Sequence, residues 1–106
     1  MNDGIRARVL IRLLPAEEGG RSTPAQGSYR PNHNFGAPSD RTMDVAFIEF
    51  ESGETLNPGD AVEREITFWQ RPGLDDVIVP GRRWHIQEGD RLVGTGVVLK
   101  VLDPNA

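Results

Sequence analysis

The chain has 106 residues, 37% of them hydrophobic, and a formal net charge of −4 at neutral pH. A chain of this length forms one domain with a single core, so we expect residues 1–106 to be one domain. The lack of cysteine excludes disulfides and thiolate chemistry, and the acidic balance argues against strong non-specific binding to nucleic acid. No segment reaches membrane-spanning length and the N-terminus has no apolar signal region, so we expect a cytoplasmic protein.

An alternation of apolar and polar residues predicts the first strand at 5–13. The odd positions of this segment are apolar and arginines occupy even positions, which is the period-two pattern of a half-buried strand. A loop rich in glycine, proline and serine follows. Residues 29–35 predict a short strand that Pro31 interrupts, because proline donates no backbone hydrogen bond.

Four more strands are predicted beyond residue 40, at 42–50, 61–70, 83–87 and 91–102. The NPGD sequence at 57–60 predicts a turn between the first two of these. Gly94 and Gly96 within the last strand predict a bulge or a tight bend, and no segment shows a helical period. Strands separated by turns every 8 to 12 residues or so predict an all-β fold, either a small closed barrel or a sandwich.

Three sequence segments carry a family resemblance. They are EGGRSTP at 18–24 followed by YRP at 29–31, NPGD at 57–60, and HIQEGDR at 85–91 followed by VGTGVV at 93–98. Over residues 5–102 the chain resembles the C-terminal domain of bacterial elongation factor Tu. The resemblance implies a six-stranded antiparallel closed β-barrel. The sequence has no GxxxxGK[ST] phosphate loop, so we expect a stand-alone relative that does not bind GTP.

The resemblance also implies a surface that contacts RNA. In that family this domain does no chemistry, but it helps to hold the backbone of aminoacyl-tRNA and touches protein partners. The RNA-contact positions carried over to this chain are Arg21, Asn32, Arg71, Gln87, Glu88 and Gly89. At two further positions Ala46 replaces a threonine and Asp90 replaces a glycine, which removes a hydroxyl and adds a negative charge. Because each lost phosphate contact weakens binding, the resemblance implies a reduced grip on RNA.

Guanidinium groups fit phosphates and carboxylates, so the arginines are candidates for an anion-binding face. The candidates are Arg21, Arg30, Arg71, Arg82, Arg83 and Arg91. The alternative is that these side chains are solvated or form structural ion pairs with carboxylates such as Glu18, Asp60 and Glu88. Arg30 fits the structural alternative best, because the YRP sequence resembles a structural corner.

A protein interface is expected around Trp69, Arg71 and His85. Trp69 follows the core-facing Phe68 and should therefore point outward, where a tryptophan can anchor a partner or stack on a base. Trp84 is expected in the core instead. His85 replaces a small residue of the family, which indicates a changed surface.

No pattern in the chain predicts catalysis, a metal or a cofactor. His33 and His85 are too few for a metal site, and no carboxylate cluster accompanies them. The adjacent acidic residues at 17–18 and 75–76 lie in turns, where a general acid–base pair is not formed. The sequence predicts a non-catalytic module that binds a protein, either a translation factor or a second copy of the chain. The alternative is a module that binds the backbone of tRNA or other RNA, and no DNA or membrane partner is expected.

Overall fold

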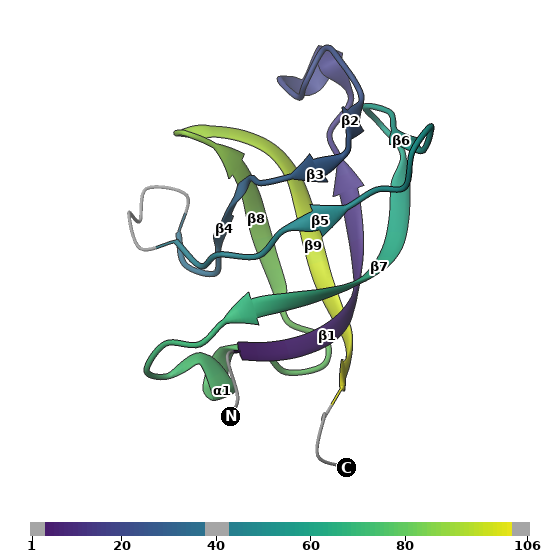
Figure 1. The fold of residues 1–106 in the computed structure, drawn as a ribbon. Coiled ribbons are helices and arrows are strands. Elements are labelled where there is room, and N and C mark those ends of the chain that lie inside the picture. The colour runs from purple at the N-terminus through teal and green to yellow at the C-terminus, as the bar shows by residue number, and fades with distance from the viewer. Residues whose placement is uncertain (1–3, 38–42, 103–106) are drawn as a thin grey trace.

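The computed structural model describes residues 4–37 and 43–102, which form a β-rich fold with little helix (Figure 1). In chain order the elements are β1 (Gly4–Leu13), the 3-10 helix η1 (Ala16–Glu18), β2 (Ala25–Gln26), β3 (Ser28–Tyr29), β4 (Asn32–Asn34), β5 (Ile48–Glu49), β6 (Thr55–Leu56), β7 (Ala61–Trp69), α1 (Leu74–Val77), β8 (Arg83–Glu88) and β9 (Arg91–Leu102). In the part of the chain that is described, neither helix is long and apolar enough to cross a membrane. The β-rich class predicted from the sequence is confirmed.

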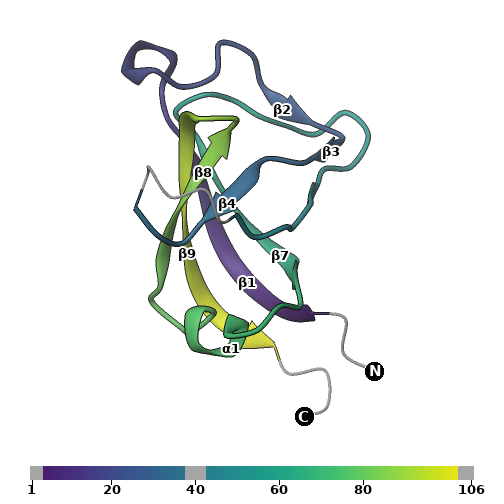
Figure 2. The same cartoon turned by 90° about the vertical axis from the view of Figure 1, so that its left-hand side faces the viewer.

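One antiparallel sheet dominates the fold, with the strand order β4-β8-β9-β1-β7. Two short ladders, β2 with β6 and β3 with β5, complete the strand pairing. Figure 1 shows β3 and β5 crossing in front of the long strands. Figure 2, turned by 90°, shows β2 and β3 to one side of β8, β9 and β1. The buried apolar side chains therefore lie between the curved sheet and the short ladders.

The pairing of β1 with β7 confirms the predicted alternation along both strands. The core-facing side chains of β1 have no exposed surface: Ala7, Val9, Ile11 and Leu13. On β7 the side chains of Ile66 and Phe68 are buried, whereas Trp69 is exposed. On the outer side of this strand pair, Arg8 donates a hydrogen bond of 3.1 Å to Glu63. The sheet therefore has one apolar inner face and one charged outer face.

Residues 44 and 45 connect the two outer strands of the sheet through backbone hydrogen bonds. Asp44 donates to the carbonyl of His33 in β4 at 2.7 Å, and His33 donates back at 3.3 Å. Trp69 at the end of β7 donates to the carbonyl of Val45 at 2.9 Å. We expected a continuous strand at 42–50, but the described part of this segment holds an isolated bridge at Asp44 and the two-residue β5. The segment is irregular because its backbone groups bond to several different strands in turn.

Other elements differ from the prediction in length. The strand predicted at 29–35 is divided into β3 and β4 at Arg30 and Pro31, as the proline indicated. The helix α1 was not predicted, because four residues are too few to show a helical period. Thr42, the first residue of the strand predicted at 42–50, lies outside the described residues.

Two glycine positions show why the strands turn and pack as they do. Asp60 donates to the carbonyl of Asn57 at 3.0 Å, and Gly59 has a φ of 91°, which is the geometry of a type II turn with glycine in third place. In β9, a Cβ atom on Gly96 would lie 2.3 Å from the ring of Trp84. Gly96 therefore allows Trp84 to pack against the sheet, while the predicted irregularity lies beside Gly94, where the β8–β9 register shifts.

Candidate functional site

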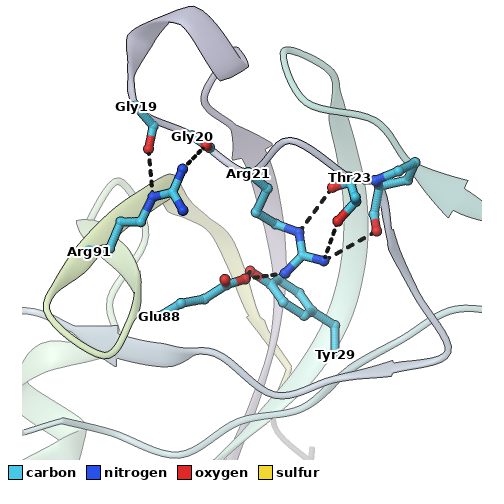
Figure 3. A network of polar contacts seen from close by, with 8 residues as sticks. Gly19, Gly20, Arg21, Thr23, Tyr29, Glu88 and Arg91 are labelled. Carbon is cyan, nitrogen blue, oxygen red and sulfur yellow. Dashed lines mark hydrogen bonds and ion pairs between the residues drawn. The ribbon is translucent and has the colours of Figure 1, made fainter.

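A network of polar contacts surrounds the β8–β9 turn (Figure 3). The carboxylate of Glu88 accepts a hydrogen bond of 2.5 Å from the hydroxyl of Tyr29 and another from the guanidinium of Arg21. Arg21 also donates to the carbonyl and the hydroxyl of Thr23, at 3.1 and 3.2 Å. Its guanidinium carbon lies 5.1 Å from the centroid of the Tyr29 ring. The guanidinium of Arg21 thus donates its hydrogen bonds to groups of the protein itself.

A second arginine ties the first loop to the same turn. Arg91, the first residue of β9, donates to the carbonyl of Gly19 at 3.0 Å and also to the carbonyl of Gly20. A Cβ atom on Gly20 would lie 2.2 Å from the carbonyl oxygen of Leu14, so only glycine fits at this close approach. The EGGR sequence, which is part of the family resemblance, therefore has a structural role here.

The network holds Glu88 in its charged form. Burial alone raises the pKa of Glu88, but hydrogen bonds from Tyr29 and Arg21 and the charges of Arg21 and Arg91 outweigh burial and lower it. Burial and the bond to this carboxylate raise the pKa of Tyr29. Burial lowers the pKa of Arg21, but the contact with Glu88 outweighs that effect and raises it. These groups therefore keep fixed charges at neutral pH and do not exchange protons.

The structure brings most of the carried-over RNA positions together at this end of the molecule. Asn32 of β4 pairs with Gln87 of β8, and Glu88 and Gly89 follow directly. The side chain of Gln87 is 1% exposed, and its amide oxygen accepts a hydrogen bond of 2.8 Å from Asn34. Gly89 has a φ of 62°, which the tight turn requires. Of these four carried-over residues only Gln87 is fully buried, whereas Asn32 and Glu88 are half-buried and Gly89 is exposed.

Arg71 is separated from that group and forms a two-pronged ion pair with Asp44. Its Nε donates to one carboxylate oxygen at 2.7 Å and its Nη2 to the other at 2.9 Å. The Asp44 side chain is 4% exposed, so the guanidinium neutralises a carboxylate that is almost fully buried. The hydrogen bonds to Asp44 raise the pKa of Arg71. Arg71 thus stabilises the irregular segment beside β4 and β7.

Trp69 lies in an exposed apolar cluster, which we call the Trp69 surface and define by Arg30, Val45, Phe47 and Trp69. Trp69 is 54% exposed, and Val45 is exposed beside it. The ring centroids of Trp69 and Phe47 are 5.7 Å apart. The guanidinium carbon of Arg30 also lies 4.7 Å from the centroid of the Phe47 ring. The cluster combines a broad aromatic area with one positive charge.

His85 lies elsewhere, on the outer face of β8. It pairs with Thr95 of β9, and β9 and β1 separate β8 from the strand that ends in Trp69. His85 therefore lies on a strand that is not adjacent to β7, whereas Arg71 follows Trp69 by two residues. The Nδ1 atom of His85 is buried and has no hydrogen-bond partner in the described part of the chain.

His33 is an interior residue with both ring nitrogens engaged. Trp84 donates its indole N–H to Nδ1 of His33 at 3.0 Å, so Nε2 carries the proton and donates to the carbonyl of Ala46 at 2.9 Å. Burial lowers the pKa of His33 to about 4. Trp84 is 3% exposed, as predicted for a core residue. Across residues 4–37 and 43–102, no group of His, Asp and Glu side chains could hold a metal ion.

No family model matches the chain.

The contributions of Val45 and Phe47 to the Trp69 surface were not predicted from the sequence, although a signal was present. Val45 and Phe47 alternate with the buried Ala46 and Ile48, so both faces of this segment are apolar. A segment that is apolar on both faces indicates that its outer face is also covered or serves as a contact surface.

Proposed function

We propose that this domain is a non-catalytic binding module for a protein partner, which docks on the Trp69 surface. The observation that carries the proposal is the exposure of Trp69 beside Phe47, with Arg30 stacked on the same ring. Tryptophan and arginine are the residues most enriched among those that dominate binding energy at protein interfaces. The large rings supply contact area with little loss of side-chain entropy.

The chemistry of the surface selects the kind of partner. In the described chain Arg30 stacks on Phe47 and has no carboxylate within ion-pair distance, unlike Arg71, which has Asp44. A partner segment that places an apolar side chain against Trp69 and a carboxylate against Arg30 would satisfy both features. The proposed partner is therefore a protein segment with an apolar residue next to an acidic one.

The resemblance to elongation factor Tu gives the proposal its biological setting. We propose that the fold is a six-stranded closed barrel of that C-terminal domain type, with residues 44–50 as the sixth strand. The hydrogen bonds from Asp44 to β4 and from Trp69 to Val45 support closure, because they join the two outer strands of the sheet. On this basis the partner belongs to the translation machinery.

The test compares three forms of the protein as bait in a native lysate. The Trp69→Ser variant removes the central ring, and the Leu10→Ser variant is the matched control. Leu10 is also an exposed apolar residue, 37% exposed, but it lies on the outer face of β1. The proposal expects a protein that co-purifies with the wild type and with Leu10→Ser but not with Trp69→Ser. If no retained protein depends on Trp69, the proposal is wrong.

A purified partner then allows the charge requirement to be measured. Arg30→Gln should weaken binding by up to about fivefold, since a rim charge pair in an interface contributes on the order of 1 kcal/mol. Raising the salt concentration should weaken the wild type more than Arg30→Gln. Equal salt dependence of the two proteins would show that the partner presents no carboxylate to Arg30.

The alternative function is recognition of an RNA backbone, favoured by the assembly of Arg21, Asn32, Gln87 and Glu88 at one end of the molecule. A phosphate approaching Arg21 must compete with the carboxylate of Glu88, which that arginine already contacts. We therefore expect no saturable binding of labelled tRNA even at low salt, where phosphate contacts are strongest. Binding that weakens with salt and is lost in Arg21→Ala would favour the RNA function instead.

A further inference from the structure

The outer face of the sheet holds a small pocket. None of the residues that line this pocket belongs to the Trp69 surface. Its volume is about 190 Å³, and it is lined by Gly36, Arg83, Trp84, His85 and Thr95. Pockets that take drug-sized ligands usually span about 300 to 1,000 Å³. This pocket therefore admits only a small chemical group.

The polar groups of the lining favour an anion. Arg83 supplies a guanidinium, Thr95 a hydroxyl and His85 an imidazole, and none of the described residues that line the pocket is a carboxylate. Arg83 is exposed and its side chain has no hydrogen bond or ion pair with any described residue, whereas the side chain of its neighbour Arg82 donates to the carbonyl of Phe35 at 2.9 Å. A buried polar atom without a partner is costly, and Nδ1 of His85 is such an atom in the described chain.

A second arginine, outside the pocket lining, lies opposite a lining residue in the register of the sheet. Thr95 pairs with His85 on one side and with Arg12 of β1 on the other. Residues that lie directly opposite in antiparallel strands place their Cβ atoms about 4.5 to 5.5 Å apart on the same face. Arg12 is exposed and, like Arg83, has no ion-pair partner in the part of the chain that is described. One arginine without an ion pair thus lines the pocket and a second lies opposite Thr95 on the neighbouring strand.

We propose that this pocket binds one phosphate group, either free phosphate or the phosphate of a small phosphomonoester. A phosphate has several oxygens to share between Arg83, Arg12 and the hydroxyl of Thr95, and guanidinium forks match that geometry. A continuous nucleic-acid backbone fits less well. The neighbouring row on the outer face runs from Arg83 through Val97 and Leu10 to Glu63, which is apolar and then acidic instead of basic.

The experiment is a titration of the isotope-labelled full chain, followed by backbone and side-chain NMR. The probes are inorganic phosphate, O-phosphoserine as a small phosphomonoester, and sulfate at matched ionic strength. Saturable shifts at Arg83, His85 and Thr95 are expected with phosphate or with phosphoserine, and the tighter of the two identifies the source. Arg83→Gln and Arg12→Gln should each weaken binding at least about tenfold, because each removes one charged contact.

Lys100→Gln is the matched control, since Lys100 lies on β9 opposite Arg8 and away from the pocket lining. It removes the same charge and should leave the phosphate affinity within about twofold. Equal weakening by Lys100→Gln, or equal affinity for sulfate and phosphate, would mean a general charge effect and would overturn the proposal. An absence of saturable shifts at the lining residues would also overturn it. The outcome is separate from that of Trp69→Ser, because the two surfaces share no residue.

Discussion

The polar network around β4 and the pocket beside His85 and Thr95 treat their cationic side chains in opposite ways, although elsewhere on the outer face Arg6 and Arg8 form ion pairs with Glu65 and Glu63. Around β4, Arg21 contacts Glu88, Arg71 contacts Asp44, and both nitrogens of His33 are bonded. On the outer face, Arg12 and Arg83 contact no described carboxylate. The comparison teaches that a basic residue marks a binding site only when the fold has not already provided its partner.

The predictions that follow test this difference between partnered and free side chains, beginning with the largest effect. The first two compare a residue around β4 with a chemically similar residue on the outer face. In each pair the substitution is matched, so general effects of lost charge or lost volume cancel. The remaining difference reports how strongly the fold depends on that side chain.

The largest effect is expected from pH and His33. Burial lowers the pKa of His33 from 6.5 to about 4, so between these values the unfolded chain binds a proton that the folded chain does not. Stability should therefore fall as the pH falls from 6.5 to 4, by about 3 kcal/mol in total. Urea unfolding at several pH values measures this slope. The His33→Gln variant should be less stable at neutral pH but should lose that part of the slope.

The control for this prediction is His85→Gln, which removes the histidine of the outer face. Carboxylates also titrate toward the lower end of this range, so only the difference between wild type and each variant is informative. If the slope disappears in His85→Gln and persists in His33→Gln, the assignment to the buried histidine is wrong.

The second effect concerns Arg71 and Arg83. Arg71→Ala leaves the nearly buried carboxylate of Asp44 without its partner, and we expect a loss of about 2 kcal/mol in the free energy of unfolding. This value is below that of a fully buried pair because Arg71 is 33% exposed. Arg83→Ala should change stability by no more than about 0.5 kcal/mol. Chemical denaturation of both variants decides the matter, and equal losses would remove the distinction between the two regions.

The smallest effect is expected at the β8–β9 turn. Glu88→Gln keeps the shape of the side chain but removes the charge that Arg21 and Tyr29 contact, and it should cost about 1 kcal/mol at pH 7. Because the fold lowers the pKa of Glu88, its contribution is present above its ordinary value of 4.5 and is lost as the pH falls through the lowered value. The stability difference between wild type and Glu88→Gln should therefore shrink below pH 4.5. A difference that is constant over that range would contradict the assigned charge.

The long strands were predictable because each carries enough residues to show its period. The alternation of apolar and polar residues in β1 and β7 predicted that both segments are strands. It also predicted which of their side chains are buried and that Trp69 is exposed. The ladder of β2 with β6 was not predicted, because two-residue strands carry no periodic pattern. The segment at 42–50 was predicted as a regular strand from its apolar residues Val45, Phe47 and Ile48, yet its hydrogen bonds are divided between β4 and β7.

The candidate sites were less predictable, since they depend on which charged groups meet across the fold. Arg71 and Asp44 are 27 residues apart, and nothing in the local sequence links them. Arg21 and Glu88 are 67 residues apart, although both lie in segments of the family resemblance. From the sequence, Arg12 was predicted only to point away from the core on the first strand. Its place beside Thr95 and His85 depends on the register of three strands.

The contrast between the two tryptophans gives the protein a pair of built-in optical reporters. Trp84 is enclosed and its indole N–H is bonded to His33, whereas Trp69 is 54% exposed. An enclosed indole emits at shorter wavelength and resists a soluble quencher, while an exposed one emits at longer wavelength and is quenched readily. A single emission spectrum therefore reports two events separately. The short-wavelength component follows the integrity of the core, and the long-wavelength component follows the occupancy of the Trp69 surface.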